Sequence, residues 1–219
     1  IDRAYVQWSP LDNFEILAGK QKNPFYTIHD SELIWDGDLR PEGISTSYSC
    51  GCGDWTFSAN LAQFVVEEGQ SPDNDDVSLF GSQLMVEGKV EALVLTLGAS
   101  YFGYNHIIGR PTIYETTKSF GNSTSGSNYA TGFLLTELFG SVGTTIGNTP
   151  VHLFYDRVEN DAAPINNSAW LAGIKIGKAK DAGSWALRYN WREVEADAVL
   201  GAFTDSDFKG GGTDGEGSE

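Results

Sequence analysis

The 219-residue chain is predicted to be all-β, an antiparallel up-and-down sheet of about ten strands. Three observations predict this fold class. Apolar and polar residues alternate with a period of two along most of the chain, and no stretch sustains the 3.6-residue period of an amphipathic helix. Short connections alternate strictly with long ones. The apolar stretches end within a few residues, well short of the about 20 that a membrane-spanning helix needs.

The alternation fixes the predicted strands one by one. It is clearest over residues 184–195, where one face is aromatic and aliphatic and the other is polar and basic. Segments around Trp170 and Trp55 repeat the pattern, whereas residues 129–142 are apolar on both faces near their middle. In chain order, strands are predicted at residues 3–9, 14–22, 43–49, 55–68, 78–87, 89–102, 129–142, 150–160, 168–178 and 184–195.

The connections between these strands distinguish a barrel from a sandwich. Short connections are predicted at residues 9–13, 50–54, 87–89, 144–149 and 180–183, and long ones at 22–42, 69–77, 103–128, 160–167 and from 196 onward. Greek-key sandwiches mix long and short loops at both ends, whereas a membrane barrel has short turns at one end and long loops at the other. We therefore expect an antiparallel up-and-down transmembrane β-barrel.

The ends of the chain predict its extent. Residues 1–6 already read as a strand, and the acidic, glycine-rich run 210–219 reads as the middle of a loop. We expect a single barrel domain over residues 1–219, an internal piece of a larger barrel and incomplete at both ends.

Composition and aromatic placement favour a membrane setting. The formal net charge of −16 argues against a nucleic-acid-binding face, which needs clustered Lys and Arg. Aromatic side chains near predicted strand ends suit the lipid headgroup layer. The expected lipid-facing aromatics are Trp55, Tyr101, Trp170, Trp185, Tyr189 and Trp191.

A long polar segment follows the second predicted strand and carries the expected constriction. Residues 25–43 combine five acids with Leu33, Ile34 and Trp35, an apolar group that would be a liability in an exposed loop. We expect this group to pack against the inner wall, so that the acids face basic wall residues across a narrowed water path. The expected pore-lining or constriction residues are Arg3, Lys20, Asp36, Asp38, Arg40, Glu42, Asp156, Lys175, Arg188 and Arg192.

Part of this segment resembles a known family. The run from Gly19-Lys20 through Asn23-Pro24-Phe25 to residues 33–43, Leu-Ile-Trp-Asp-Gly-Asp-Leu-Arg-Pro-Glu-Gly, is similar to the signature of a porin family of Gram-negative bacteria. Arg3-Ala4-Tyr5 and residues 205–214 are similar to its flanking blocks. The resemblance implies a large channel-forming β-barrel in the bacterial outer membrane. Its expected partners are outer-membrane lipid or lipopolysaccharide and small hydrophilic solutes, and a homo-oligomer is compatible with the sequence.

Two alternatives come from other classes of protein. In a soluble β-sandwich that binds carbohydrate, the apolar face would be core and exposed aromatics would stack on sugar rings. An enzyme is disfavoured because no nucleophile and base stand at a recognisable spacing, and no cofactor or metal is expected. Cys50 and Cys52 do not form half of a four-cysteine zinc site, because the chain has no second cysteine pair, and we favour an oxidised pair in a turn.

Overall fold

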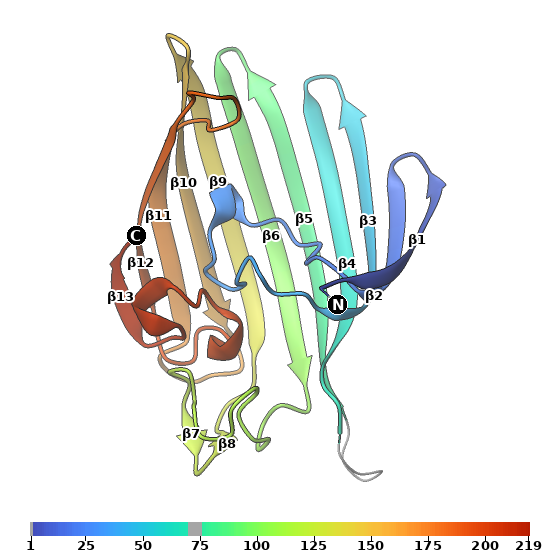
Figure 1. The fold of residues 1–219 in the computed structure, drawn as a ribbon, viewed down its shortest axis with the longest axis vertical. Helices are drawn as coiled ribbons and strands as arrows, with labels where there is room; N and C mark the ends of the chain where they lie inside the picture. Colours follow the sequence, from blue (N-terminus) through green and yellow to red (C-terminus); the bar gives the residue numbers. More distant parts are fainter. Residues whose placement is uncertain (1, 70–75) are drawn as a thin grey trace.

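The computed structural model describes residues 2–69 and 76–219, and its dominant feature is one curved antiparallel sheet of 11 strands (Figure 1). The strands of this sheet are β1 (Ala4–Leu11), β2 (Phe14–Lys20), β3 (Glu42–Cys52), β4 (Trp55–Glu67), β5 (Val77–Val90), β6 (Leu93–Asn105), β9 (Leu134–Ile146), β10 (Thr149–Asn160), β11 (Ser168–Gly177), β12 (Ala186–Val194) and β13 (Gly215–Ser218). A separate hairpin joins β7 (Thr124–Ser125) to β8 (Asn128–Tyr129).

The order of the strands in the sheet is the same as their order along the chain, with β1 and β13 at the two edges. The expected all-β, antiparallel up-and-down architecture is therefore confirmed. Figure 1 also shows the predicted asymmetry, with the short turns gathered at one end of the sheet and most of the long connections at the other. The described helices are three single 3-10 turns, η1 (Ile28–Asp30), η2 (Gly201–Phe203) and η3 (Phe208–Gly210). Within the described residues, no helix is long and apolar enough to cross a membrane.

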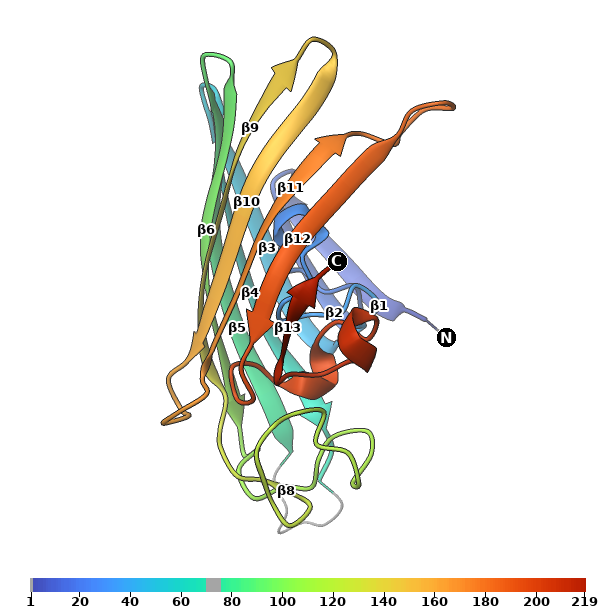
Figure 2. The ribbon, with the colours of Figure 1, turned by 90° about the vertical axis from the view of Figure 1, so that its left-hand side faces the viewer.

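The two faces of the sheet differ in what covers them. Two segments lie on the concave side of the sheet, here named the inner face: residues 21–41, named the inward segment, and the loop of residues 195–214 (Figure 2). The opposite, outer face carries exposed large apolar side chains such as Leu97, Leu138 and Leu187, which are 56–61% exposed. The buried core therefore lies between the sheet and the segments on its inner face.

Several predicted boundaries were wrong. The turn between β5 and β6 lies at Glu91 and Ala92 rather than at residues 87–89, because Glu91 adopts a left-handed φ of 56° that closes a tight hairpin there. The strand predicted at 129–142 runs over Leu134–Ile146, since residues 130–133 belong to the preceding loop. The chain end predicted as loop contains β13, which pairs with β12 through backbone hydrogen bonds.

The predicted turn disulfide is also wrong. Cys50 and Cys52 are free, and both lie within β3 rather than in the turn that follows. Residues two apart in a strand point to the same face about 6.6 Å apart at Cα, and their parallel side-chain vectors do not favour a disulfide.

Candidate functional site

The inward segment is attached to the inner face by its apolar side chains. Leu33, Ile34 and Trp35 are 1–4% exposed, and the Trp35 ring lies 5.1 Å from Phe102 of β6, edge to face. Phe25 packs against the same Phe102 at 4.9 Å between ring centroids. The aliphatic and indole groups predicted to pack inward are thus buried between the segment and the sheet.

One glycine makes room for this contact. A Cβ atom at Gly81 of β5 would lie 2.3 Å from Cζ of Phe25, closer than two carbon atoms can approach. The absence of a side chain at Gly81 therefore lets the Phe25 ring lie directly on the backbone of the wall. A larger residue at position 81 would push the inward segment off the sheet.

Polar contacts fix the register of the inward segment on the wall. The Tyr26 backbone N–H donates to Oε1 of Gln83 at 2.7 Å, and Nε2 of Gln83 returns a bond to the Tyr26 carbonyl at 2.9 Å. The Ser31 hydroxyl donates to the Asp156 carboxylate at 3.0 Å, and Lys175 Nζ donates to Asp30 at 2.8 Å. These contacts reach from β5 to β11, so the segment crosses the middle of the sheet.

The predicted basic residues of the wall lie on neighbouring inner-face positions. Lys175 and Arg188 are direct cross-strand partners on β11 and β12. Arg188 donates to the carbonyl of Asp30, so both residues hold the same turn of the inward segment. Arg192 is 2% exposed and bonds to Asp205 at 2.7 Å and to the Glu219 carboxylate. Arg192 and the 2%-exposed Asp156 are therefore wall residues that other segments cover.

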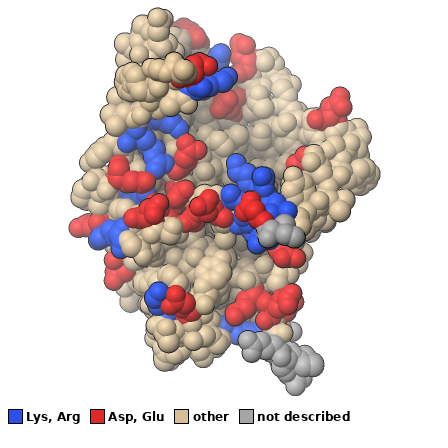
Figure 3. Space-filling view, in the orientation of Figure 1, with Lys and Arg blue, Asp and Glu red and all other residues tan. Residues whose placement is uncertain are grey.

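The remaining predicted charged residues gather at the other end of the inward segment. Asp36, Asp38, Arg40 and Lys20 line a cavity of about 390 Å³ together with Asp2, Tyr114, Phe203 and Ser206 of distant segments. We name this cavity the charged hollow. Lys20 and Glu42 are register partners at the strand ends where the inward segment begins and ends, and Arg3 lies 3.5 Å from Asp2. Figure 3 shows acidic and basic side chains across the middle of the inner face.

Backbone hydrogen bonds hold the acids of the hollow in place. The Asp36 carboxylate accepts the N–H groups of Asp38 at 2.7 Å and Ser206 at 3.2 Å, while its own N–H donates to Phe203 at 2.7 Å. Arg40 donates to the carbonyl of Gly37 at 2.8 Å. The inward segment and the 195–214 loop therefore form one continuous wall of the hollow.

Burial and charge perturb the acid–base groups of the inward segment. The pKa of His29 is lowered to about 4, first by burial and then by the nearby His152 and Lys175. The hydrogen bond from Lys175 is the main cause that lowers the pKa of Asp30, and burial raises the pKa of Glu32. Across the neutral range His29 is uncharged and Asp30 is ionised, which suits its ion pair with Lys175.

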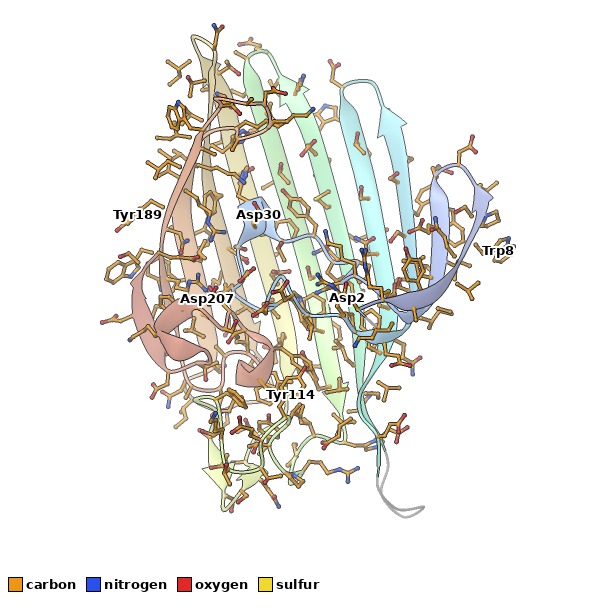
Figure 4. The ribbon with its side chains drawn as sticks, in the orientation of Figure 1. Asp2, Trp8, Asp30, Tyr114, Tyr189 and Asp207 are labelled. Carbon is orange, nitrogen blue, oxygen red and sulfur yellow. The ribbon has the colours of Figure 1, made fainter. Side chains whose placement is uncertain are left out.

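The predicted lipid-facing aromatics share one side of the molecule. Strand register assigns five of them to the outer face: Trp55, Tyr101, Trp170, Tyr189 and Trp191. Trp185, directly before β12, is 59% exposed. The Trp170 ring stacks on Tyr155, a neighbour on the same face. Figure 4 shows Tyr189 pointing away from the inner face.

Sequence reasoning missed several residues of the site. Tyr114 and Phe203 come from loops far along the chain, and no local pattern connects them to Asp36. Gln83 and Glu137 are polar residues buried on the inner face, where the Ser100 hydroxyl contacts both side chains. A buried polar residue in an alternating strand predicts a hydrogen-bond partner, but not the segment that supplies it. No group of three or more described His, Cys, Asp or Glu residues is placed to hold a metal ion.

The fold and the inward segment together define a barrel-type wall with one exposed apolar face and one face that loops cover. A protein-family model described as "Putative porin" matches residues 1–137 and 148–219, and the chain belongs to this family. No curated protein and no solved structure matches the chain. Family membership supports a porin-like function in general and a non-enzymatic role.

Proposed function

We propose that the chain forms part of the wall of a water-filled channel in the bacterial outer membrane, through which small hydrophilic solutes or ions diffuse passively. The outer face, with its exposed aliphatic and aromatic side chains, would contact lipid. The inner face would border water, which spares polar solutes the cost of entering hydrocarbon. Membership of the porin family and the contrast between the two faces support this assignment.

The observation that carries the proposal is the position of the inward segment. It lies across the inner face, where Ser45 of β3 donates to Gln21 and Arg188 of β12 donates to the Asp30 carbonyl. Its charged residues Asp36, Asp38 and Arg40 line the charged hollow. A segment in this place narrows whatever space the wall encloses. In the soluble-sandwich alternative, a second sheet would cover the inner face, yet loops and the inward segment cover it in the described residues.

Deletion of residues 29–40 tests this proposal. The full-length protein should conduct ions in planar bilayers, and the deletion should raise its single-channel conductance because the constriction is removed. Heat-modifiability on gels, a property of folded membrane barrels, serves as the control for folding. Unchanged conductance in a heat-modifiable deletion variant would place the constriction elsewhere, and a protein that stays in buffer without detergent would favour the sandwich.

A charge variant tests whether the hollow faces the water path. The double substitution Asp36→Asn and Asp38→Asn keeps the shape of both side chains and should lower the preference for cations, read as the reversal potential under a salt gradient. The matched control replaces Asp12 and Asp181, two acids in short turns, by Asn. Equal shifts in both double variants would contradict the assignment of the hollow to the channel.

A further inference from the structure

We propose that the charged hollow is a binding site for sugars, with the Tyr114 ring as the surface on which a sugar ring stacks. The inference rests on the proposed function, because the hollow must border the solute path. The solutes that such a path would favour are neutral, ring-shaped molecules rich in hydroxyl groups.

The hollow is assembled from five separate parts of the chain. Asp2 precedes β1, Lys20 ends β2, Asp36 belongs to the inward segment, Tyr114 to the loop after β6, and Phe203 to the loop after β12. Figure 4 labels Asp2 and Tyr114 on this face. The volume of about 390 Å³ is within the range of small-molecule sites. A second cavity of about 190 Å³ shares Lys20, Tyr114 and Phe203 with it, so the two cavities adjoin.

Tyr114 presents an aromatic ring to this space. It is 68% exposed, although its ring lies 5.9 Å from that of Phe203, which fixes it from one side. Its φ of 66° is left-handed, a conformation that is uncommon for an aromatic residue. Such a conformation is costly, and residues that adopt it cluster at binding sites. An exposed, supported ring offers an apolar surface to the C–H face of a pyranose.

Acidic and basic side chains stand side by side around the hollow, an arrangement that offers a hydroxyl group both acceptors and donors. Arg40 lies 3.7 Å from Asp2 and 3.8 Å from Asp38, and the Asp36 carboxylate accepts two backbone N–H groups. A charged solute would meet a charge of its own sign beside each charge that attracts it. A hydroxyl group can donate to one carboxylate and accept from one cation without separating them.

A buried donor lies beside the same space. Trp35 is 4% exposed, its indole Nε1–H has no hydrogen-bond partner, and its side chain lines the smaller cavity together with Lys20 and Arg40. An unpaired buried donor is costly, and a ligand oxygen would relieve that cost. Trp35 thus leaves a donor without a partner in the wall of the smaller cavity that adjoins the hollow.

Current blockade in planar bilayers tests the inference with the full-length protein and three probes: maltose, the open-chain polyol sorbitol and the zwitterion diglycine. Maltose should block the ion current, and sorbitol and diglycine should block it far less. Tyr114→Ala should weaken maltose binding about tenfold, the upper range for an aromatic contact, whereas Tyr114→Phe, which keeps the ring, should stay within about twofold.

The outcomes separate this inference from the proposed function. A protein without ion conductance refutes the channel and the sugar site with it, whereas conductance without maltose blockade refutes the sugar site alone. Stronger blockade by diglycine or sorbitol than by maltose would overturn the class of solute. Wild-type maltose affinity in Tyr114→Ala would overturn the stacking role. If that variant does not fold, the comparison of the three probes on the unaltered protein still tests whether the channel favours sugars.

Discussion

Replacing Trp35 by alanine should release the inward segment from the wall. Trp35 is 4% exposed and contacts the rings of Phe25, Phe102 and Phe203 at centroid distances of 6.2, 5.1 and 6.3 Å. Removing a buried tryptophan of this kind costs about 3–5 kcal/mol. Because the ring lies between the segment and the sheet, most of this loss should fall on the attachment of the segment rather than on strand pairing.

The expected effect can be stated as a change in population. A loss of about 3–5 kcal/mol corresponds to an increase of roughly 150- to 5,000-fold in the fraction of molecules with a detached segment. Cleavage within residues 21–41 by a protease should accelerate accordingly, and single-channel records should show a larger or noisier conductance. Both readouts are local, because a detached segment is exposed while the sheet stays paired.

A matched control separates attachment from general destabilisation. Trp8→Ala removes the same side chain from β1, where it is 63% exposed and points away from the inner face (Figure 4). This variant should retain the protease resistance and the conductance of the unaltered protein. If Trp35→Ala behaves like Trp8→Ala in both assays, the packing of Trp35 does not hold the inward segment, and the reasoning fails.

Three further predictions follow from the faces and contacts of the sheet. A spin label at Leu187 should be more accessible to oxygen, and a spin label at Arg188 should be more accessible to a polar relaxant. Equal accessibilities of the two labels would contradict the membrane orientation. Gly81→Val should displace Phe25, since even a Cβ would lie 2.3 Å from its ring, and should speed proteolysis of the inward segment; a protease-resistant variant would argue against this close contact. The lowered pKa of His29, about 4, means that the unfolded chain takes up a proton near pH 6.5 while the folded chain does not. The contribution of neutral His29 to stability is therefore present above pH 6.5 and lost as the pH falls towards 4. Over this pH range the unfolding midpoint of His29→Asn should fall less steeply than that of the unaltered protein, and equal slopes would refute this role of His29.

Most of the sheet could be predicted because its strands obey a simple rule. Where one face is apolar and the other polar, as in β12, alternation alone assigns each side chain to a face. The rule failed near Phe133 and Leu135, which are both buried although one belongs to the loop and the other to β9. It also missed β13, whose Gly-Glu-Gly-Ser sequence has no apolar alternation and which depends on pairing with β12.

The candidate site was predictable only in part, because some of its contacts depend on local sequence and others on distant loops. Leu33, Ile34 and Trp35 form an apolar group in a polar segment, and such a group must be buried somewhere, so the inward fold follows from local sequence. The positions of Tyr114 and Phe203 beside Asp36 depend on two long loops that return to the inner face. Contacts between residues so far apart in the chain leave no local pattern to detect.

The pairing of charges on the inner face separates anchoring from selectivity. Two basic residues of the wall meet an acid from a covering segment. Lys175 of β11 meets Asp30, whose side chain is 79% exposed, and Arg192 of β12 meets Asp205 in a pair that is fully buried. A buried pair of this kind contributes little net field to a passing ion, and breaking it is strongly destabilising. The Asp38 side chain, in contrast, is fully exposed, so its 3.8 Å pair with Arg40 in the charged hollow is a weak surface pair. We therefore expect Arg192 to hold the 195–214 loop, and the acids of the hollow to set the preference for ions.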